Sequence, residues 1–347
     1  ALLASCGQTD KPVDQGHVEV TKPSPDAVVS LPEITFTDVS ADVGIDYVHL
    51  NNASGERWMP EIMVGGIAFI DFDRDGNPDI FAYSGTHDES ETRGGSSFVV
   101  YRNLGDGSFR DVTEELGLFN DQLGFGVTVA DLTGDGWADL YLSAHGSNSL
   151  FVSEGGKSFR DVTDSLRVGG DQKALSVVTN ASDVDNDGDL DLLVGNYVDW
   201  SPERDARIDE RFDGISRAYS HPNIFDGAPA YLFINNYPEP FEDASLERGI
   251  SVQAGRDVKG KVLGIVSTDL NDDRVPDYLL ANDSISNFAF LSDGSDGFDE
   301  TADRLGFSYN NLGQATAAMG IDSAWLGEDL VLHVAIGNLS AEMSSIY

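Results

Sequence analysis

The chain is poor in cysteine and in basic side chains, and each deficit excludes a class of protein. A single cysteine, Cys6, among 347 residues excludes an internal disulfide, so stability must come from the core and from bound ions. Lysine and arginine number 21 against 60 aspartates and glutamates, a net charge of −39. A chain this acidic is repelled by nucleic acid and by anionic membrane surfaces, which argues against both as direct partners.

Long apolar runs and catalytic signatures are also missing. No stretch approaches the roughly 20 apolar residues of a membrane-spanning helix. The six histidines are scattered, without the His-x-x-x-His or glutamate pairing of transition-metal sites. Neither a nucleophile elbow nor a phosphate-binding loop is present. These absences favour a non-catalytic protein, with an enzyme as the alternative.

Aspartate is abundant instead, and it is arranged in a loop. Residues 71–79 read Asp-Phe-Asp-Arg-Asp-Gly-Asn-Pro-Asp, between two apolar runs, 65–70 and 80–83, that are typical of strands. Carboxylates at positions 1, 3, 5 and 9, with a glycine at position 6 for a sharp turn, suit a hard cation, and the backbone carbonyl of position 7 would join them. The loop is not an EF-hand, because position 12 is Ala82 rather than glutamate.

The loop recurs at 131–139, 183–191 and 269–277, each time before an apolar run. The second copy has Thr133 at position 3; the fourth has Asn271 there and Arg274 in place of the glycine. A single copy is equally well a solvated acidic turn, but four copies in one strand context predict three to four Ca²⁺ sites. The predicted ligands are Asp71, Asp73, Asp75, Asn77, Asp79, Asp131, Thr133, Asp135, Trp137, Asp139, Asp183, Asp185, Asp187, Asp189, Asp191, Asp269, Asn271, Asp273, Val275 and Asp277, with position 7 contributing its carbonyl.

Residues 1–32 predict a membrane anchor rather than a folded part. Leu3-Ala4-Ser5-Cys6 resembles the bacterial lipobox, in which a lipidated cysteine becomes the mature N-terminus. Cys6 is therefore the predicted lipidation site in a signal-peptide remnant, and Gly7 after it favours the outer membrane. The stretch 8–32 is polar and rich in proline, which predicts a disordered tether. The alternative for Cys6 is a free thiol in an unstructured N-terminus.

From residue 33 onward the chain consists of repeats. A Phe-x-Asp-Val-Thr-like segment accompanies the acidic loops, at 36–40, 109–113, 159–163, 241–245 and, shortened, 298–301. Its phenylalanine is expected in the core, and its aspartate and threonine are expected to hold turn backbone. The loops begin 60, 52 and 86 residues apart, and the long interval holds a polar insertion at about 199–229. Units of about 50–60 residues with four strands each predict an all-β fold, a β-propeller, over 33–347.

The last unit departs from this pattern. Residues 319–331 have the strand context but no acidic loop, so no metal site is expected there. The sequence then stops at Tyr347, where the earlier units continue into their turn and Phe-x-Asp segment. A complete ring of blades is therefore expected to need more chain.

These units resemble FG-GAP/VCBS repeats, the calcium-loop blades of integrin-α-type propellers. The stretches 63–73, 195–200 and 337–343 look more narrowly like the bacterial cartilage-acidic-protein-like (ASPIC/UnbV) family. The resemblance covers about 33–347 and implies a seven-bladed, calcium-dependent propeller, secreted or held at the surface and mostly without catalysis. The chain departs from this family pattern in three ways: Arg274 replaces the loop glycine, the fifth acidic loop is missing, and the C-terminal ASPIC/UnbV segment of the longer members is absent from the sequence.

The sequence thus predicts a calcium-stabilised extracellular module for binding or adhesion, held by lipid at the bacterial outer membrane or secreted, with a protein or glycan ligand. The alternative is a surface or periplasmic glycan-active enzyme, similar to polysaccharide lyases on calcium propellers, which clustered Lys, Arg, Tyr or His at the channel mouth would indicate. A periplasmic assembly scaffold is a third reading. In the insertion, Trp200, Tyr219, His221 and Phe225 either face a ligand or cover the propeller's edge.

Overall fold

The computed structural model describes residues 34–63, 65–84, 96–214, 216–294, 297–327, 331–339 and 341–347, in two units, 1–39 and 40–347. The predicted lipidation site Cys6 and the tether lie outside the described residues. In the first unit, residues 34–39 form no strand and Phe36 is 94% exposed. The prediction of a core phenylalanine there is wrong. In the later copies the segment pairs with the strand just before it in the chain, and residues 34–35 supply no such strand.

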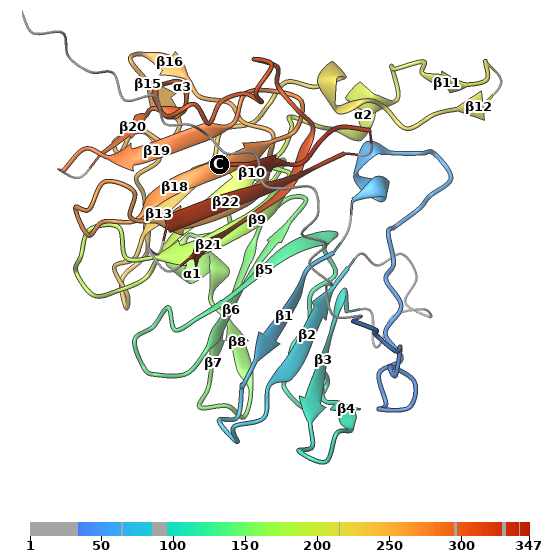
Figure 1. Ribbon diagram of the computed structural model, residues 1–347. Helices are drawn as coiled ribbons and strands as arrows, with labels where there is room; N and C mark the ends of the chain where they lie inside the picture. Colours follow the sequence, from blue (N-terminus) through green and yellow to red (C-terminus); the bar gives the residue numbers. More distant parts are fainter. Residues whose placement is uncertain are drawn as a thin grey trace, which may run out of the picture. The chain divides into compact units, whose positions relative to one another are not determined.

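Within residues 40–347, antiparallel sheets follow one another along the chain (Figure 1). Four of them have four strands and one has three, in the part of the chain that the structure describes. The first sheet comprises β1 (Ile67–Ile70), β2 (Asp79–Tyr83), β3 (Phe98–Asn103) and β4 (Phe109–Asp111). The second comprises β5 (Gly124–Ala130), β6 (Asp139–Ala144), β7 (Ser149–Ser153) and β8 (Phe159–Asp161). The third comprises β9 (Ser176–Ser182), β10 (Asp191–Asn196), β13 (Tyr231–Ile234) and β14 (Glu242–Asp243).

The fourth sheet comprises β17 (Val262–Thr268), β18 (Asp277–Asn282), β19 (Phe288–Ser292) and β20 (Phe298–Glu300). The fifth comprises β21 (Ala318–Leu326), β22 (Val331–Asn338) and β23 (Ser345–Ile346). A hairpin of β15 (Val252–Gln253) and β16 (Arg256–Asp257) and the short helices η1 (Met59–Ile62), α1 (Thr163–Leu166) and α3 (Ala302–Leu305) lie in the connections. No helix among the described residues is long and apolar enough to cross a membrane.

The first strands of successive sheets lie against one another, from β1 to β5, β9, β17 and β21. Close approach needs glycine at these strands. A Cβ on Gly126 would lie 2.4 Å from the Val177 carbonyl oxygen of β9, and one on Gly264 would lie 2.8 Å from the Ile321 side chain of β21. This is how propeller blades pack. The fold is therefore all-β with successive propeller blades, as the sequence predicts, and the described blades do not close into a ring.

The core lies in layers between neighbouring sheets. Between the first two sheets, Phe81 and Tyr83 pack with Leu142 and Phe151, and the other interfaces are built in the same way. A middle strand such as β6 is buried at every position because alternate side chains enter the layers on its two sides. Each blade therefore depends on its neighbours for its core.

The Phe-x-Asp-Val-Thr segments play the expected role in the later copies. Phe159 is buried, as are Phe241 and Phe298, while Phe109 is half-buried. In the second blade, Asp161 Oδ1 accepts a hydrogen bond from the Thr163 amide at 2.9 Å. The Thr163 hydroxyl oxygen accepts one from the Leu150 amide at 2.8 Å. The prediction that these polar side chains satisfy turn backbone is confirmed.

The insertion is ordered by one buried carboxylate. It contains α2 (Pro202–Asp205), β11 (Arg211–Phe212), β12 (Ser216–Arg217) and η3 (Pro222–Ile224). Asp205 is fully buried and accepts hydrogen bonds from Trp200 Nε1 at 2.7 Å and the Met59 amide at 2.9 Å. Arg217 Nη2 lies 2.7 Å from Asp205 Oδ1, and its guanidinium stacks 4.7 Å above the Trp58 ring. Polar residues of the insertion are thus organised around the buried Asp205 carboxylate.

Candidate metal centre

The four acidic loops occupy the same place in four sheets, between the first and second strands. In the first loop, Asp71 Oδ1 accepts a hydrogen bond from the Asp75 amide at 3.0 Å and Asp71 Oδ2 accepts one from the Gly76 amide at 3.1 Å. Asp75 Oδ1 in turn accepts from the Asn77 amide at 2.8 Å. Asp131 and Asp269 bind the same backbone amides in their own loops. The position-1 aspartate therefore folds the loop around itself.

Two positions of each loop adopt left-handed backbone. At position 6, φ is 85° for Gly76 and 73° for Arg274, so Arg274 adopts a backbone conformation that costs a side chain about 1 kcal/mol. Position 4 is also left-handed, with φ of 57° at Arg74 and 62° at Asp272. The sequence pattern does not reveal position 4, because it carries arginine, glycine, asparagine and aspartate in the four copies.

The position-9 aspartates Asp79, Asp139, Asp191 and Asp277 are buried at the start of the second strand of each sheet. Asp139 Oδ2 accepts from the Leu132 amide at 2.9 Å, and Asp139 Oδ1 accepts from the Ser153 amide at 2.9 Å. The other three make the equivalent pair of bonds. Burial raises the pKa of Asp79, Asp139 and Asp191 to about 6, and it also raises the pKa of Asp277.

Carboxylates converge most closely in the first and third loops. One oxygen each of Asp71, Asp73 and Asp79 lies within 4.8 Å of the other two, and Asp183, Asp185 and Asp187 form a second such group. In the third loop, Asp183 Oδ1 and Asp185 Oδ1 are buried without a hydrogen-bond partner among the described residues. Unpartnered anionic oxygens are costly, and a cation with oxygen ligands satisfies them. These residues fit a bound Ca²⁺.

The second and fourth loops offer fewer charges. Position 3 is Thr133 in one and Asn271 in the other, and among the described residues neither loop assembles three clustered carboxylates. The Thr133 hydroxyl is nevertheless buried without a partner, whereas Asn271 Nδ2 donates to the Ser292 carbonyl at 3.2 Å. The second loop thus keeps an available oxygen. The use of position-7 carbonyls, at Asn77, Trp137, Asp189 and Val275, stays a prediction.

Arginines reach into the loops, which the sequence pattern does not indicate. Arg102, near the end of β3, forms an ion pair with Asp73. Arg248 forms one with Asp185, at 3.1 Å between Nη2 and Oδ2. Arg74 of the first loop lies 4.5 Å above the Trp137 ring of the second loop. The loops are therefore joined to neighbouring strands and to each other.

The structure also answers what the insertion residues do. Trp200 and Phe225 are buried in a cluster with Met59 and Phe125, so they cover the neighbouring blades rather than face a ligand. Tyr219 is half-buried and His221 is exposed.

Tyr197 and Lys261 both lie near Asp283, close to the insertion. Tyr197 donates a hydrogen bond to the Asp283 carboxylate, and Lys261 Nζ donates to the Pro222 carbonyl at 2.9 Å. The side chains of Tyr197, Asp283 and Lys261 are buried. Burial raises the pKa of Tyr197 and lowers that of Lys261. Tyr197 keeps its proton at neutral pH, and the Lys261 amine donates hydrogen bonds to the Pro222 carbonyl and to Asn223 Oδ1.

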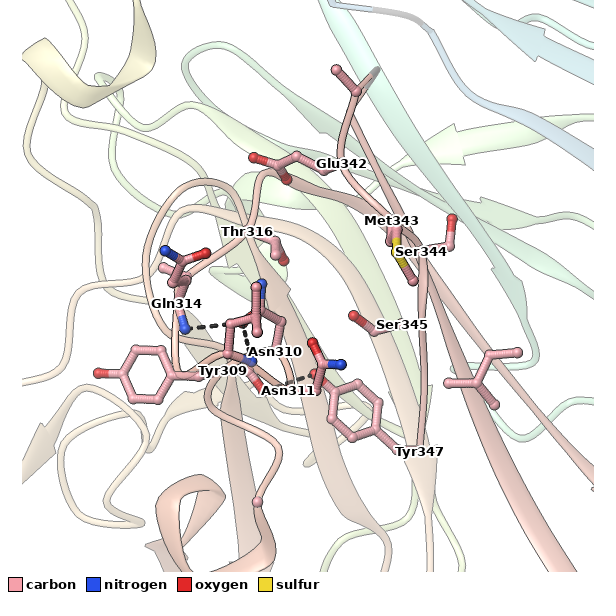
Figure 2. A pocket seen from close by; sticks show the side chains of 15 residues that line it. Tyr309, Asn310, Asn311, Gln314, Thr316, Glu342, Met343, Ser344, Ser345 and Tyr347 are labelled. Atoms are coloured by element: carbon pink, nitrogen blue, oxygen red, sulfur yellow. Dashed lines mark hydrogen bonds between the residues drawn. The ribbon is translucent and has the colours of Figure 1, made fainter.

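A groove of about 570 Å³ lies between the β20–β21 connection and residues 341–347. Figure 2 shows Tyr309, Asn311 and Gln314 on one wall and Met343, Ser344, Ser345 and Tyr347 on the other. The Tyr347 hydroxyl donates to the Tyr309 carbonyl at 3.3 Å, which joins the walls. The side chains of Asn311, Gln314, Ser344 and Ser345 make no hydrogen bond to another described residue. The groove therefore offers aromatic faces and available amide and hydroxyl groups.

One comparison, with protein-family models, agrees with the repeated pattern. The family model described as FG-GAP-like repeat matches residues 71–142 and 131–194. No curated protein matches the chain. Among solved structures, the chain is similar to one in "Crystal structure of BBS1N in complex with ARL6DN, soaked with mercury", at 9% identity and a TM-score of 0.42, covering 81% of this chain and 62% of that chain. The chain therefore contains FG-GAP-like repeats, which include its first three acidic loops.

Proposed function

We propose that the chain is a calcium-stabilised, non-catalytic propeller module that binds a glycan or protein ligand at a cell surface. The observation that carries the calcium part is the third loop, where Asp183 Oδ1 and Asp185 Oδ1 are buried beside Asp187 and have no hydrogen-bond partner in the part of the chain that the structure describes. Four loops of one geometry, and a match to FG-GAP-like repeats, which often bind calcium, support the same reading. A bound Ca²⁺ would supply positive charge to the converging carboxylates.

The role proposed for calcium is structural. Each loop joins two strands of one blade, and its position-9 aspartate also holds the end of the third strand. Arg74 and Trp137 connect the first loop to the second. A cation that fixes the loop conformation therefore fixes both the blade and its spacing to the next blade. Loops of this kind on extracellular modules bind calcium at about 10⁻⁴–10⁻³ M, which suits the predicted location outside the cell.

The proposed ligand surface is the groove between the β20–β21 connection and residues 341–347. Its lining contains no lysine, arginine or histidine, and its one carboxylate, Glu342, accepts a hydrogen bond from the Ala317 amide at 2.8 Å. Tyrosine faces with free amides and hydroxyls suit a neutral ligand rich in hydroxyl groups. A neutral glycan fits this chemistry better than a charged peptide.

Glycan and protein arrays probed with the full chain test the ligand part. We expect calcium-dependent binding to neutral glycans that falls at least tenfold in Asn311→Ala/Gln314→Ala. A matched control is Asn236→Ala, which changes an amide outside the groove. Binding that the double substitution leaves unchanged would remove the groove as the ligand site. Binding to no array in calcium would contradict the adhesion role, and turnover of a bound glycan would favour the enzyme alternative.

A further inference from the structure

We infer that Arg102 and Arg248 are internal counter-charges of the first and third acidic loops, which stabilise these loops without metal and weaken their affinity for calcium. The inference rests on the proposed calcium binding and adds its regulation. It starts from two contacts: the Arg102 guanidinium pairs with Asp73, and Arg248 Nη2 lies 3.1 Å from Asp185 Oδ2. In both contacts the partner is the position-3 aspartate, and Arg102 Nη2 also lies 3.9 Å from Asp75 Oδ2 at position 5.

In the described part of the chain, an arginine from outside the loop pairs with an acidic loop only where position 3 of that loop is an aspartate. The second and fourth loops carry Thr133 and Asn271 at this position, and no lysine or arginine in the described part of the chain forms an ion pair with either loop. Arg102 and Arg248 come from unrelated places: Arg102 from β3 of the same sheet, Arg248 from the segment that follows β14. Arginines from two different parts of a blade thus pair with the same loop position, which indicates that an aspartate at position 3 needs a nearby positive charge.

The number of charges in each loop explains why this positive charge is needed. At positions 1, 3, 5 and 9 the first and third loops have four carboxylates, and the paired guanidinium brings each of these sets to −3. Outside these four positions, the first loop also carries Arg74 and the third loop also carries Asp189. The second and fourth loops have three carboxylates at these positions, also −3. Clustered carboxylates repel one another strongly where water is partly excluded, so an additional aspartate needs a nearby positive charge when no cation is bound.

Burial makes the pair at the third loop the stronger case. The side chains of Arg248 and Asp185 are only 14% and 18% exposed, so solvent and salt screen the pair less than an ordinary surface pair. The same guanidinium opposes a bound Ca²⁺ in two ways. It engages one oxygen of a predicted ligand, and its charge repels the ion. The arginine therefore has effects of opposite sign in the metal-free and calcium-bound chain.

The test is to measure both effects, on stability without metal and on calcium affinity, in the full chain. The variants are Arg248→Met, Arg102→Met and Arg248→Lys, of which the last keeps the positive charge. Arg211→Met is the matched control, because Arg211 pairs with Asp209 at the surface of the insertion and its loss changes the net charge equally. In EDTA, we expect Arg248→Met to lower the thermal midpoint by roughly 1–3 °C. In calorimetric titration with CaCl₂, we expect it to tighten one class of sites about tenfold, the effect of one nearby charge. Arg248→Lys should retain affinity close to that of the parent chain.

The outcomes separate the two levels of the hypothesis. If the parent chain binds calcium but Arg248→Met and Arg102→Met bind it with unchanged or weaker affinity, the counter-charge inference is overturned and the proposed function stands. If Arg211→Met tightens binding as much as Arg248→Met does, net charge rather than the specific pair is responsible, which also overturns it. A parent chain that binds no calcium overturns the proposed function and this inference together.

Discussion

The carboxylate of Asp139 accepts a hydrogen bond from the Ser153 amide at 2.9 Å and so ties the second acidic loop to the last residue of β7. Its other oxygen accepts from the Leu132 amide inside the loop. Asp79, Asp191 and Asp277 join their own blades in the same way. Position 9 is thus a structural link between three strands of a blade, whether or not a cation is present.

Asp139→Ala is therefore expected to destabilise the metal-free chain. Two buried backbone amides lose their acceptor, which costs about 2–4 kcal/mol in the free energy of unfolding. Urea denaturation in EDTA measures it. The control is Asp135→Ala in the same loop, because Asp135 is exposed and binds only the Trp137 amide. Equal effects of the two substitutions in EDTA would mean that Asp139 acts only as a metal ligand.

Arg274→Gly is expected to stabilise the chain. Arg274 holds φ at 73°, where a side chain costs about 1 kcal/mol and glycine nothing, although glycine gives back part of this through a more flexible unfolded chain. We expect a net gain of about 0.5 kcal/mol in the free energy of unfolding, measured by chemical denaturation. Arg304→Gly in α3 should do the opposite. A loss of stability in Arg274→Gly would show that the arginine makes a contact worth more than its backbone strain.

The buried pair of the insertion leads to a third expectation. Asp205→Asn leaves the Arg217 guanidinium without a counter-charge and removes an acceptor from Trp200, Met59 or Ser220. A loss of about 2–4 kcal/mol follows, with faster proteolysis of 199–229 as a local readout. Asp209→Asn, which disrupts an exposed pair with Arg211, serves as the control and should have little effect. An insertion as resistant in Asp205→Asn as in the parent would contradict the role of this carboxylate.

His145 predicts a pH dependence. Burial beside the Trp200 ring lowers the pKa of His145 below its ordinary value of about 6.5. The unfolded chain then binds a proton more readily than the folded chain, so this stabilising contribution is complete above about pH 6.5 and is lost as the pH falls below it. Denaturation of the parent and of His145→Gln at several pH values between 5 and 8 measures the difference. The parent should lose stability relative to the variant on acidification; a constant difference would exclude the histidine as the cause.

Local regularity explains which parts of the fold the sequence predicts. The acidic loops and the Phe-x-Asp-Val-Thr segments are encoded within a few residues, so the blades and the positions of the loops follow from spacing. Contacts made over long separations do not. Arg248 and Asp185 are 63 residues apart, and Met59 and Asp205 are 146 apart, and neither pair has a periodic signature. Phe36 shows the reverse case, a matching motif that pairs with no strand among the described residues.

The most direct test of the calcium claim is thermal unfolding of the full chain with millimolar Ca²⁺, with Mg²⁺ and with EDTA. Each occupied site contributes about 1.4 kcal/mol at a tenfold excess of calcium over its Kd. The midpoint should rise with Ca²⁺, respond little to Mg²⁺, and rise less in Asp183→Ala, which removes a buried oxygen that no described residue hydrogen-bonds. A midpoint that is the same in Ca²⁺ and EDTA would show that the acidic loops are solvated turns and would contradict the calcium-stabilised module.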